Sequence, residues 1–88
     1  MMRVLRLDRK NVEARELEGE LVILDLKAHR YIGGNRTAAS LWPLLERGAT
    51  HEELTEHLVT RFGVANEAAH TDVDSFVSIM RELDLLEE

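Results

Sequence analysis

The chain has 88 residues, enough for one domain with one modest hydrophobic core and too few for two. Its composition, 44% hydrophobic and 32% charged, is that of a folded globular domain and not of a disordered segment. The absence of cysteine excludes disulfides, zinc–thiolate sites and thiol catalysis, and no apolar run approaches the roughly 20 residues that cross a bilayer. We therefore expect a single domain over residues 1–88.

The basic start of the chain, MMRVLRLDRK, lacks the apolar segment and small-residue cleavage site of a signal peptide. Together with the absence of cysteine, this predicts a cytoplasmic protein with no direct membrane insertion.

The net charge of −6 is unevenly distributed. Residues 1–45 carry eight Lys and Arg against six Asp and Glu, whereas residues 46–88 carry three against eleven. An acidic C-terminal half repels phosphate backbones, because nucleic-acid binding depends on cations that neutralise phosphates. Basic peptides are better partners for this half, and we expect no nucleic acid.

Three strands are predicted in the first part of the chain. Residues 12–18 alternate weakly between apolar and charged side chains, and Gly19 with Glu20 marks a tight turn. Leu21–Leu26 is apolar on both faces, as in a central strand, and Arg30–Ile32 follows after a short turn and ends at two glycines. These segments predict a three-stranded antiparallel meander.

Helices are predicted for the remainder. Asn35 is a suitable N-cap for a helix over residues 36–46, in which Pro43 predicts a kink or a late start near Ser40. Thr50 and Glu53 form a capping box for a second helix that Gly63 ends.

The third helix is predicted from a cap at Asn66 to about Asp84. At 100° per residue it has one wide apolar face, formed by Ala69, Val73, Phe76, Val77, Met80 and Leu83, with Ile79 and Leu86 on one flank. This apolar face is wider than packing on two short helices requires. Either it also covers the sheet, or one of its flanks lines a groove. The predicted fold is α+β and winged helix-turn-helix-like, a three-stranded antiparallel sheet followed by three helices.

The residues that carry catalysis or bind metals form no recognisable pattern. None of His29, His51, His57 and His70 is paired with another histidine at helical spacing, so we expect solvated surface histidines and no metal site. No G-x-S-x-G segment and no phosphate-binding glycine loop is present. We expect no enzyme, no catalytic residue and no cofactor.

A winged-helix DNA-binding protein is the alternative that the order of elements suggests. The recognition helix would come from the acidic half, where Asp72 and Asp74 would face phosphates, and the basic residues are scattered through the strands and the N-terminus. These observations disfavour DNA binding, which stays the alternative hypothesis.

A binding module is the hypothesis that remains. A meander has two open edges, and the glycines after the third strand allow close approach of another backbone. An extended peptide is expected to add as a fourth strand along His29, Arg30, Tyr31, Ile32 and Gly33, beside the third helix. The predicted wall of that helix consists of Asp72, Val73, Phe76, Ile79 and Met80.

Three of these assignments have a structural alternative. Phe76 and Met80 are equally suited to the core, and Tyr31 is equally suited to anchoring the sheet to the first helix against Trp42. Asp72 can hold a cation or a hydroxyl of the peptide, or can be a solvated acid at a helix N-terminus.

The ordered motifs GELVILDLKAHRYIGGNRTAASLW, THEEL and DVDSFVSIMRELDLL resemble the PqqD-like family of leader-recognition elements for ribosomally made, post-translationally modified peptides (RiPP recognition elements). The resemblance covers residues 12–87. The matching positions are Glu20, Val22, Asp25, Arg30, Tyr31, Asn35, Trp42, Asp72, Leu85 and Leu86.

The length and the Thr-His-Glu-Glu cap look most like the free-standing leader-binding proteins of lasso-peptide biosynthesis. The resemblance implies a precursor leader peptide as partner, presented to a leader peptidase and a macrolactam cyclase. A peptide chaperone for a radical-SAM enzyme of PQQ biosynthesis is the alternative within the family. Gly34, Ala38 and Asp84 depart from the family pattern, and the glycine predicts a less firmly packed end of the third strand.

Overall fold

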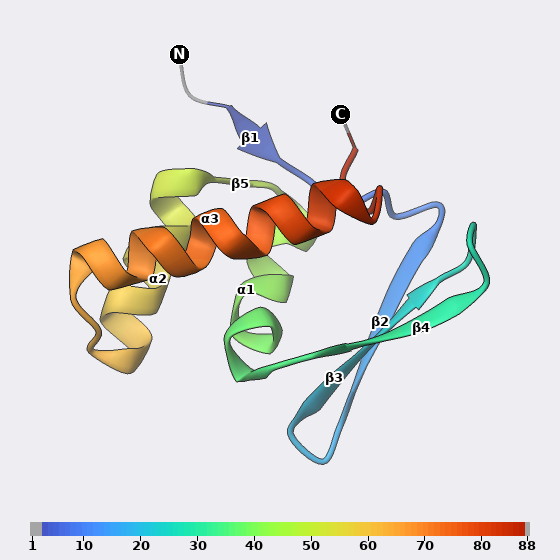
Figure 1. Cartoon of the computed structure of the whole chain (residues 1–88), viewed down its shortest axis with the longest axis horizontal. Coiled ribbons are helices and arrows are strands. Elements are labelled where there is room, and N and C mark those ends of the chain that lie inside the picture. The colour runs from blue at the N-terminus through green and yellow to red at the C-terminus, as the bar shows by residue number, and fades with distance from the viewer. Residues whose placement is uncertain (1–2, 88) are drawn as a thin grey trace.

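The computed structural model describes residues 3–87 and has an α+β fold. The sheet has the order β2-β3-β4, with β2 over Val12–Leu17, β3 over Glu20–Asp25 and β4 over Arg30–Gly34, all antiparallel. Three helices follow: α1 over Arg36–Arg47, α2 over His51–Phe62 and α3 over Asn66–Glu82. The predicted meander and the three helices are thus confirmed (Figure 1).

The N-terminal segment forms structure that the sequence analysis did not predict. A short strand β1, Val4–Leu5, pairs with β5, Ala49–Thr50, which lies between α1 and α2. Leu7 forms an antiparallel bridge with Leu86, and the Asp8 amide donates to the Leu85 carbonyl at 3.0 Å. Residues 7–8 and 85–86 therefore lie side by side, just after the end of α3.

The sheet presents one face to the helices. Leu21 and Ile23 of β3 are 5% and 3% exposed, and Ile32 of β4, the partner of Ile23, packs against the same core. Leu24 and Tyr31 are also paired and lie on the opposite face, where the Tyr31 side chain is 80% exposed. The alternation of a strand thus assigns every second residue to the core.

The helix termini follow their sequence signals in all but two places. The Asn35 side chain accepts from the Ala38 amide, and Thr50 with Glu53 forms the complete predicted capping box. The predicted cap at Asn66 is wrong, because Ala65 holds the N-cap position and makes no side-chain hydrogen bond.

The predicted late start of the first helix is also wrong. The helix α1 begins at Arg36 and continues through Pro43 to Arg47. Its first turn is capped by Asn35, and Leu41, Trp42 and Leu45 are buried along one face. This burial offsets the backbone hydrogen bond that proline cannot donate.

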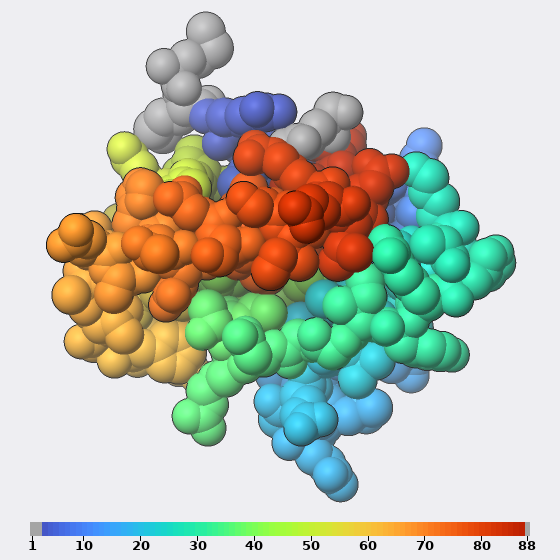
Figure 2. Space-filling model, viewed as in Figure 1, coloured from blue at the N-terminus to red at the C-terminus, as the bar shows by residue number. Residues whose placement is uncertain are grey.

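The core lies between the inner face of the sheet and the three helices, and α2 packs against both α1 and α3. Figure 2 shows the surface of α3 running beside the surface of β4 and the start of α1. Within residues 3–87, none of the helices is both long enough and apolar enough to cross a membrane.

Candidate functional site

Strand β4 forms one edge of the three-stranded sheet. In the described part of the chain it pairs with β3 and with no second strand. An edge strand has backbone donors and acceptors on its outer side that a further strand can use. The direction of each peptide group decides which residues of β4 offer them.

Hydrogen bonds on the other side of β3 fix these directions. The Leu26 amide donates to the Asn11 carbonyl, toward β2, at 2.8 Å. The carbonyl of Asp25, in the same trans peptide group, therefore points the opposite way, toward β4. Because both backbone groups of a strand residue point to the same side, Asp25, Ile23 and Leu21 bond to β4.

The same alternation identifies the outward groups of β4. The partners of Asp25, Ile23 and Leu21 are Arg30, Ile32 and Gly34, so these three bond inward to β3. The N–H and C=O groups of Tyr31 and Gly33 consequently point outward from the sheet edge. Four backbone groups, on two residues of the predicted template, are oriented to receive another strand.

The flank of α3 beside this edge is partly apolar. Ile79 is 54% exposed, Phe76 is half-buried against the core, and Asp72 is exposed. His70 and Asp74 lie on the opposite flank, where both approach His51 of α2. The helix therefore directs Asp72, Phe76 and Ile79 away from α2. We call these three side chains, with the outer edge of β4, the β4–α3 surface.

Two predicted wall residues lie in the core. Val73 is 0% exposed and Met80 is 2% exposed, so neither presents its side chain to a peptide. The physical reason is their angular position at the centre of the apolar face of α3, which packs on the other helices and the sheet. The predicted wall is corrected to Asp72, Phe76 and Ile79, with Val73 and Met80 supporting it from inside.

Arg30 connects the start of β4 to the end of α3. Its Nε donates to Asp25 Oδ2 at 2.9 Å, and its Nη2 donates to the Leu83 carbonyl at 3.1 Å. Beside it, Lys27 Nζ lies 2.7 Å from Asp84 Oδ2. Leu83 and Lys27 were not predicted as determinants of this arrangement, because no sequence spacing relates a hairpin turn to a helix end more than 50 residues later.

Asp25 organises the turn between β3 and β4. Its Oδ1 accepts from the Ala28 amide at 3.1 Å, and its side chain is 5% exposed. The Ala28 hydrogen bond, together with the Arg30 guanidinium, holds the pKa of Asp25 below its ordinary value against the opposing effect of burial. His29 follows in this turn with a left-handed backbone, φ 55°, and an exposed side chain, so it continues no strand.

Tyr31 does not anchor the sheet to α1. Its side chain is 80% exposed on the outer face of the sheet, whereas Trp42 is 5% exposed in the core. The alternative in which these two residues pack together is wrong, because Tyr31 pairs with Leu24 and both point away from the helices. Tyr31 and its neighbours instead line an open hollow of about 220 Å³ on the outer face.

Gly34 is closely packed, contrary to the expectation of a loose strand end. A Cβ atom at this position would lie 3.0 Å from Leu21 Cδ2 and 3.3 Å from Ala38 Cβ. Glycine thus lets β3 and the first turn of α1 approach each other directly, and their side chains fill the space that a larger residue would occupy. A Cβ atom at Gly33 would meet nothing within 4 Å.

A serine and a histidine also meet in the structure. Ser40 Oγ lies 2.7 Å from His57 Nε2 and joins α1 to α2. Nucleophilic catalysis also needs donors for an oxyanion, yet the backbone amides around Ser40 lie inside a helix and are occupied by its hydrogen bonds. The contact is consistent with a structural bond between helices.

Solved structures resemble this fold over nearly its full length. The structure of TbiB1 in complex with the TbiA(β) leader peptide matches with a TM-score of 0.83 and 24% sequence identity, over 93% of this chain and 94% of that chain. A lasso peptide synthetase B1 complexed with the leader peptide matches with a TM-score of 0.81 and 23% identity, over 96% of this chain and 98% of that chain. At these identities the likeness establishes the fold.

Among curated proteins, no sequence matches the chain. One protein family matches the chain: residues 20–86 match coenzyme PQQ synthesis protein D (PqqD). The match runs from the first residue of β3 to Leu86, which forms the bridge with Leu7. The match includes β4, α3 and the contacts between them, and because it extends over most of the sequence, the chain belongs to the PqqD family.

Proposed function

We propose that this protein binds the leader segment of a ribosomally made precursor peptide at the β4–α3 surface, by β-strand addition. The observation that carries the proposal is the outward direction of the Tyr31 and Gly33 backbone groups on an edge strand whose surface runs beside that of α3, the helix with the exposed Ile79 side chain (Figure 2). The fold supports it, since two solved proteins of the same fold were determined with leader peptides.

The protein would recognise the added strand through both the backbone and the side chains of the peptide. Hydrogen bonds to Tyr31 and Gly33 hold any extended peptide, because backbone groups carry no sequence information. Side chains of the peptide alternate between the two faces of the enlarged sheet. One set faces Phe76 and Ile79, and the other lies on the outer face beside Tyr31, so specificity is expected at every second leader residue.

The interactions available at this surface are sufficient for useful affinity. Burying an aliphatic or aromatic side chain contributes about 1.5–3 kcal/mol, and a net hydrogen bond about 0.5–1.5 kcal/mol. Two apolar anchors and four backbone hydrogen bonds would contribute about 5–12 kcal/mol before the costs of association, so a Kd near 1 μM, about −8 kcal/mol net, requires the upper end of this range.

Charge favours a basic leader. Asp72 lies exposed at the edge of the β4–α3 surface, and residues 46–88 carry eleven acidic against three basic side chains. A lysine or arginine of the leader placed next to Asp72 would therefore meet a favourable potential that salt screens. We expect leader affinity to fall as ionic strength rises.

We further propose that the protein delivers the bound leader to a leader peptidase and a macrolactam cyclase of lasso-peptide maturation. We place this step in the cytoplasm, and the protein itself catalyses no reaction in it. The support is the PqqD family and the likeness to a lasso peptide synthetase B1. In this arrangement the outer face of the sheet stays uncovered while β4 holds the leader.

A peptide chaperone of PQQ biosynthesis, acting with a radical-SAM enzyme, is the second candidate, because the matching family is described by that pathway. The two candidates share the β4–α3 surface and differ in the peptide. A DNA-binding role gains no support from the structure, since Glu67, Asp72 and Asp74 are exposed on α3.

Titration with a synthetic leader, taken from the precursor gene next to this one, tests the proposal. Fluorescence polarisation is expected to show saturable 1:1 binding, and the amide groups of Tyr31 and Gly33 should become protected from hydrogen exchange when the leader is present. A flat titration far above micromolar concentrations would refute the proposal. Binding of a PQQ precursor instead would select the second candidate, and binding of random duplex DNA at low salt would reopen the DNA-binding alternative.

A further inference from the structure

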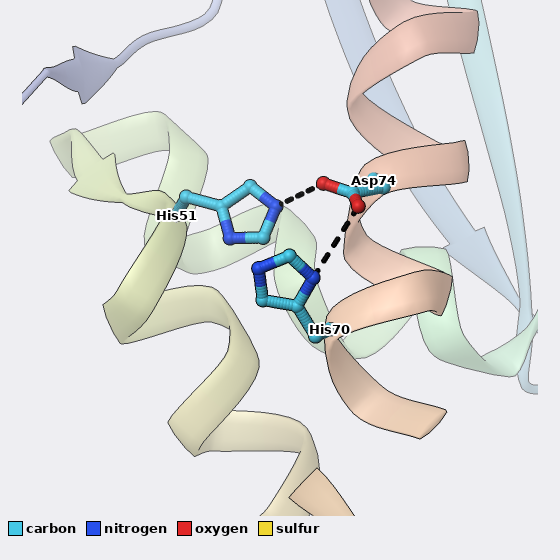
Figure 3. Close-up of side chains that lie close together, drawn as sticks. All are labelled: His51, His70 and Asp74. Atoms are coloured by element: carbon cyan, nitrogen blue, oxygen red, sulfur yellow. Dashed lines mark hydrogen bonds and ion pairs between the residues drawn. The ribbon is translucent and has the colours of Figure 1, made fainter. Parts of the chain in front are cut away.

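Two histidines that the sequence analysis assigned to the solvated surface meet in the structure. His51 is the first residue of α2, and His70 lies in the first half of α3. Their ring centroids are 4.6 Å apart, and Asp74, one turn after His70, lies beside both rings (Figure 3). The spacing of His70 and Asp74 was visible in the sequence, but the approach of His51 required the packing of α2 on α3.

The carboxylate of Asp74 contacts both rings. His51 Nε2 lies 2.6 Å from Asp74 Oδ1, and His70 Nδ1 lies 3.3 Å from Asp74 Oδ2 (Figure 3). One nitrogen from each histidine and a carboxylate oxygen lie within 4.8 Å of one another. In a tetrahedral zinc site the ligand atoms are roughly 3.3 Å apart, so small rotations of these partly exposed side chains would complete the geometry.

Thr55 lies against the other side of the His51 ring. Its hydroxyl donates to the His51 carbonyl at 2.9 Å and its oxygen lies 3.4 Å from His51 Nδ1. When Nε2 carries the ring proton, its 2.6 Å contact with Asp74 Oδ1 is an N–H···O hydrogen bond. A metal ion on Nε2 would replace this proton, and the proton on Nδ1 would then be free to bond to the Thr55 oxygen.

We propose that His51, His70 and Asp74 bind a divalent transition-metal ion, with Zn²⁺ as the biological candidate. Two imidazole nitrogens and one carboxylate oxygen suit Zn²⁺ and its first-row neighbours, whereas Mg²⁺ and Ca²⁺ prefer oxygen ligands alone. Thr55 orients His51 by accepting from the opposite ring nitrogen, as the outer partners of metal-bound histidines do. This proposal departs from the expectation, drawn from the sequence, of no metal site.

The fourth coordination position faces solvent. Beside the cluster is an open hollow of about 470 Å³, lined among others by Glu52, Glu56 and Asn66. A metal site with three protein ligands keeps a position for water or for a group from a partner. The cluster lies on the flank of α3 opposite Phe76 and Ile79, so a bound ion would join α2 to α3 without covering the β4–α3 surface.

Zinc and cobalt titrations of the full, tag-free chain test this site. We expect 1:1 Zn²⁺ binding by calorimetry, visible d–d absorption on addition of Co²⁺, and a rise in Tm of roughly 6–11 °C at Zn²⁺ about tenfold above Kd. Binding should weaken as the pH falls, because protons compete for the imidazole nitrogens.

Variants separate the metal site from an ordinary ion pair. His70→Ala and Asp74→Asn, both at exposed positions, should weaken Zn²⁺ binding at least about tenfold. His29→Ala is the matched control and should leave binding unchanged. If the native chain shows no saturable 1:1 binding, or if both variants bind as it does, Asp74 serves only as a hydrogen-bond acceptor for two histidines and the proposal is wrong. Neither result bears on leader binding.

Discussion

Arg30 Nη2 donates to the Leu83 carbonyl over 3.1 Å, so a side chain at the start of the edge strand is bonded to the end of α3. The same guanidinium bonds the buried Asp25 carboxylate. Through these contacts Arg30 sets the position of β4 relative to α3, the two elements that form the β4–α3 surface.

Replacing Arg30 with Gln should therefore weaken leader binding about tenfold, because the strand and helix lose their common anchor and Asp25 loses its cation. Fluorescence polarisation with the synthetic leader measures the change. Arg15→Gln is the matched control, since Arg15 is exposed on β2 at the far edge of the sheet. Equal effects of the two substitutions would mean that only overall charge matters.

The Gly33 amide points outward from the sheet edge, so a proline at this position tests the edge directly. Ile32 bonds inward to β3, so a proline there would damage the sheet itself. Gly33→Pro removes an outward donor and keeps the inward ladder, and its restriction on the preceding residue is compatible with a strand.

We expect Gly33→Pro to lower leader affinity at least about tenfold while the circular dichroism spectrum stays native. Gly33→Ala retains the amide donor and should bind within about twofold of the native protein. If both variants bind normally, the peptide does not use this edge.

The Ile79 side chain tests the helical half of the surface. Because it is 54% exposed, Ile79→Glu should change the free energy of unfolding by no more than about 0.5 kcal/mol. Leader affinity should nevertheless fall at least about tenfold, since a carboxylate would face the apolar side chains of the peptide. Leu17→Glu, at a residue 59% exposed beside the β2–β3 turn, is the control that should leave binding unaltered.

The two adjacent glycines should respond oppositely to a larger side chain. Gly34→Leu is expected to lower the free energy of unfolding by about 1–3 kcal/mol, because Leu21 and Ala38 already occupy the space. Gly33→Ala should be neutral or stabilising by up to about 1 kcal/mol, because its side chain enters open space. Urea unfolding measures both, and a stabilised Gly34→Leu variant would contradict the packing described for this strand end.

Acid should destabilise the fold through two carboxyl groups. The Ala28 amide with the Arg30 guanidinium lowers the pKa of Asp25, and the Thr50 backbone amide lowers the pKa of Glu53. A carboxyl group whose pKa is lower in the folded state than in the unfolded state stabilises the folded protein. This stabilisation is complete at pH values above the unfolded-state pKa and is lost as the pH falls through the folded-state pKa.

The urea midpoint should accordingly decrease from about pH 5 downward. Asp25→Asn should be less stable than the native protein at pH 7 and should show a shallower decrease in acid. If the urea midpoint of Asp25→Asn falls in acid as steeply as that of the native protein, Asp25 does not contribute to the acid sensitivity of the fold.

Local structure was predictable from the sequence, because interactions between neighbouring residues decide it. The central strand at Leu21–Leu26, read from its apolar run, the Thr50–Glu53 capping box and the left-handed Gly63 were all predictable from neighbouring residues. The existence of an exposed edge at Arg30–Gly34 followed from the meander in the same way. Even here Asn66 failed as a predicted cap, because several N-terminal positions compete within one turn.

The packing of the whole fold decides which side chains are accessible and which distant residues meet. Val73 and Ile79 both belong to the apolar side of α3, yet packing buries one and exposes the other. The contact of Arg30 with Leu83 and the convergence of His51 on His70 depend on how a hairpin and two helices dock. These relations arise from close packing across the core, where positions far apart in sequence are constrained together, and no local pattern encodes them.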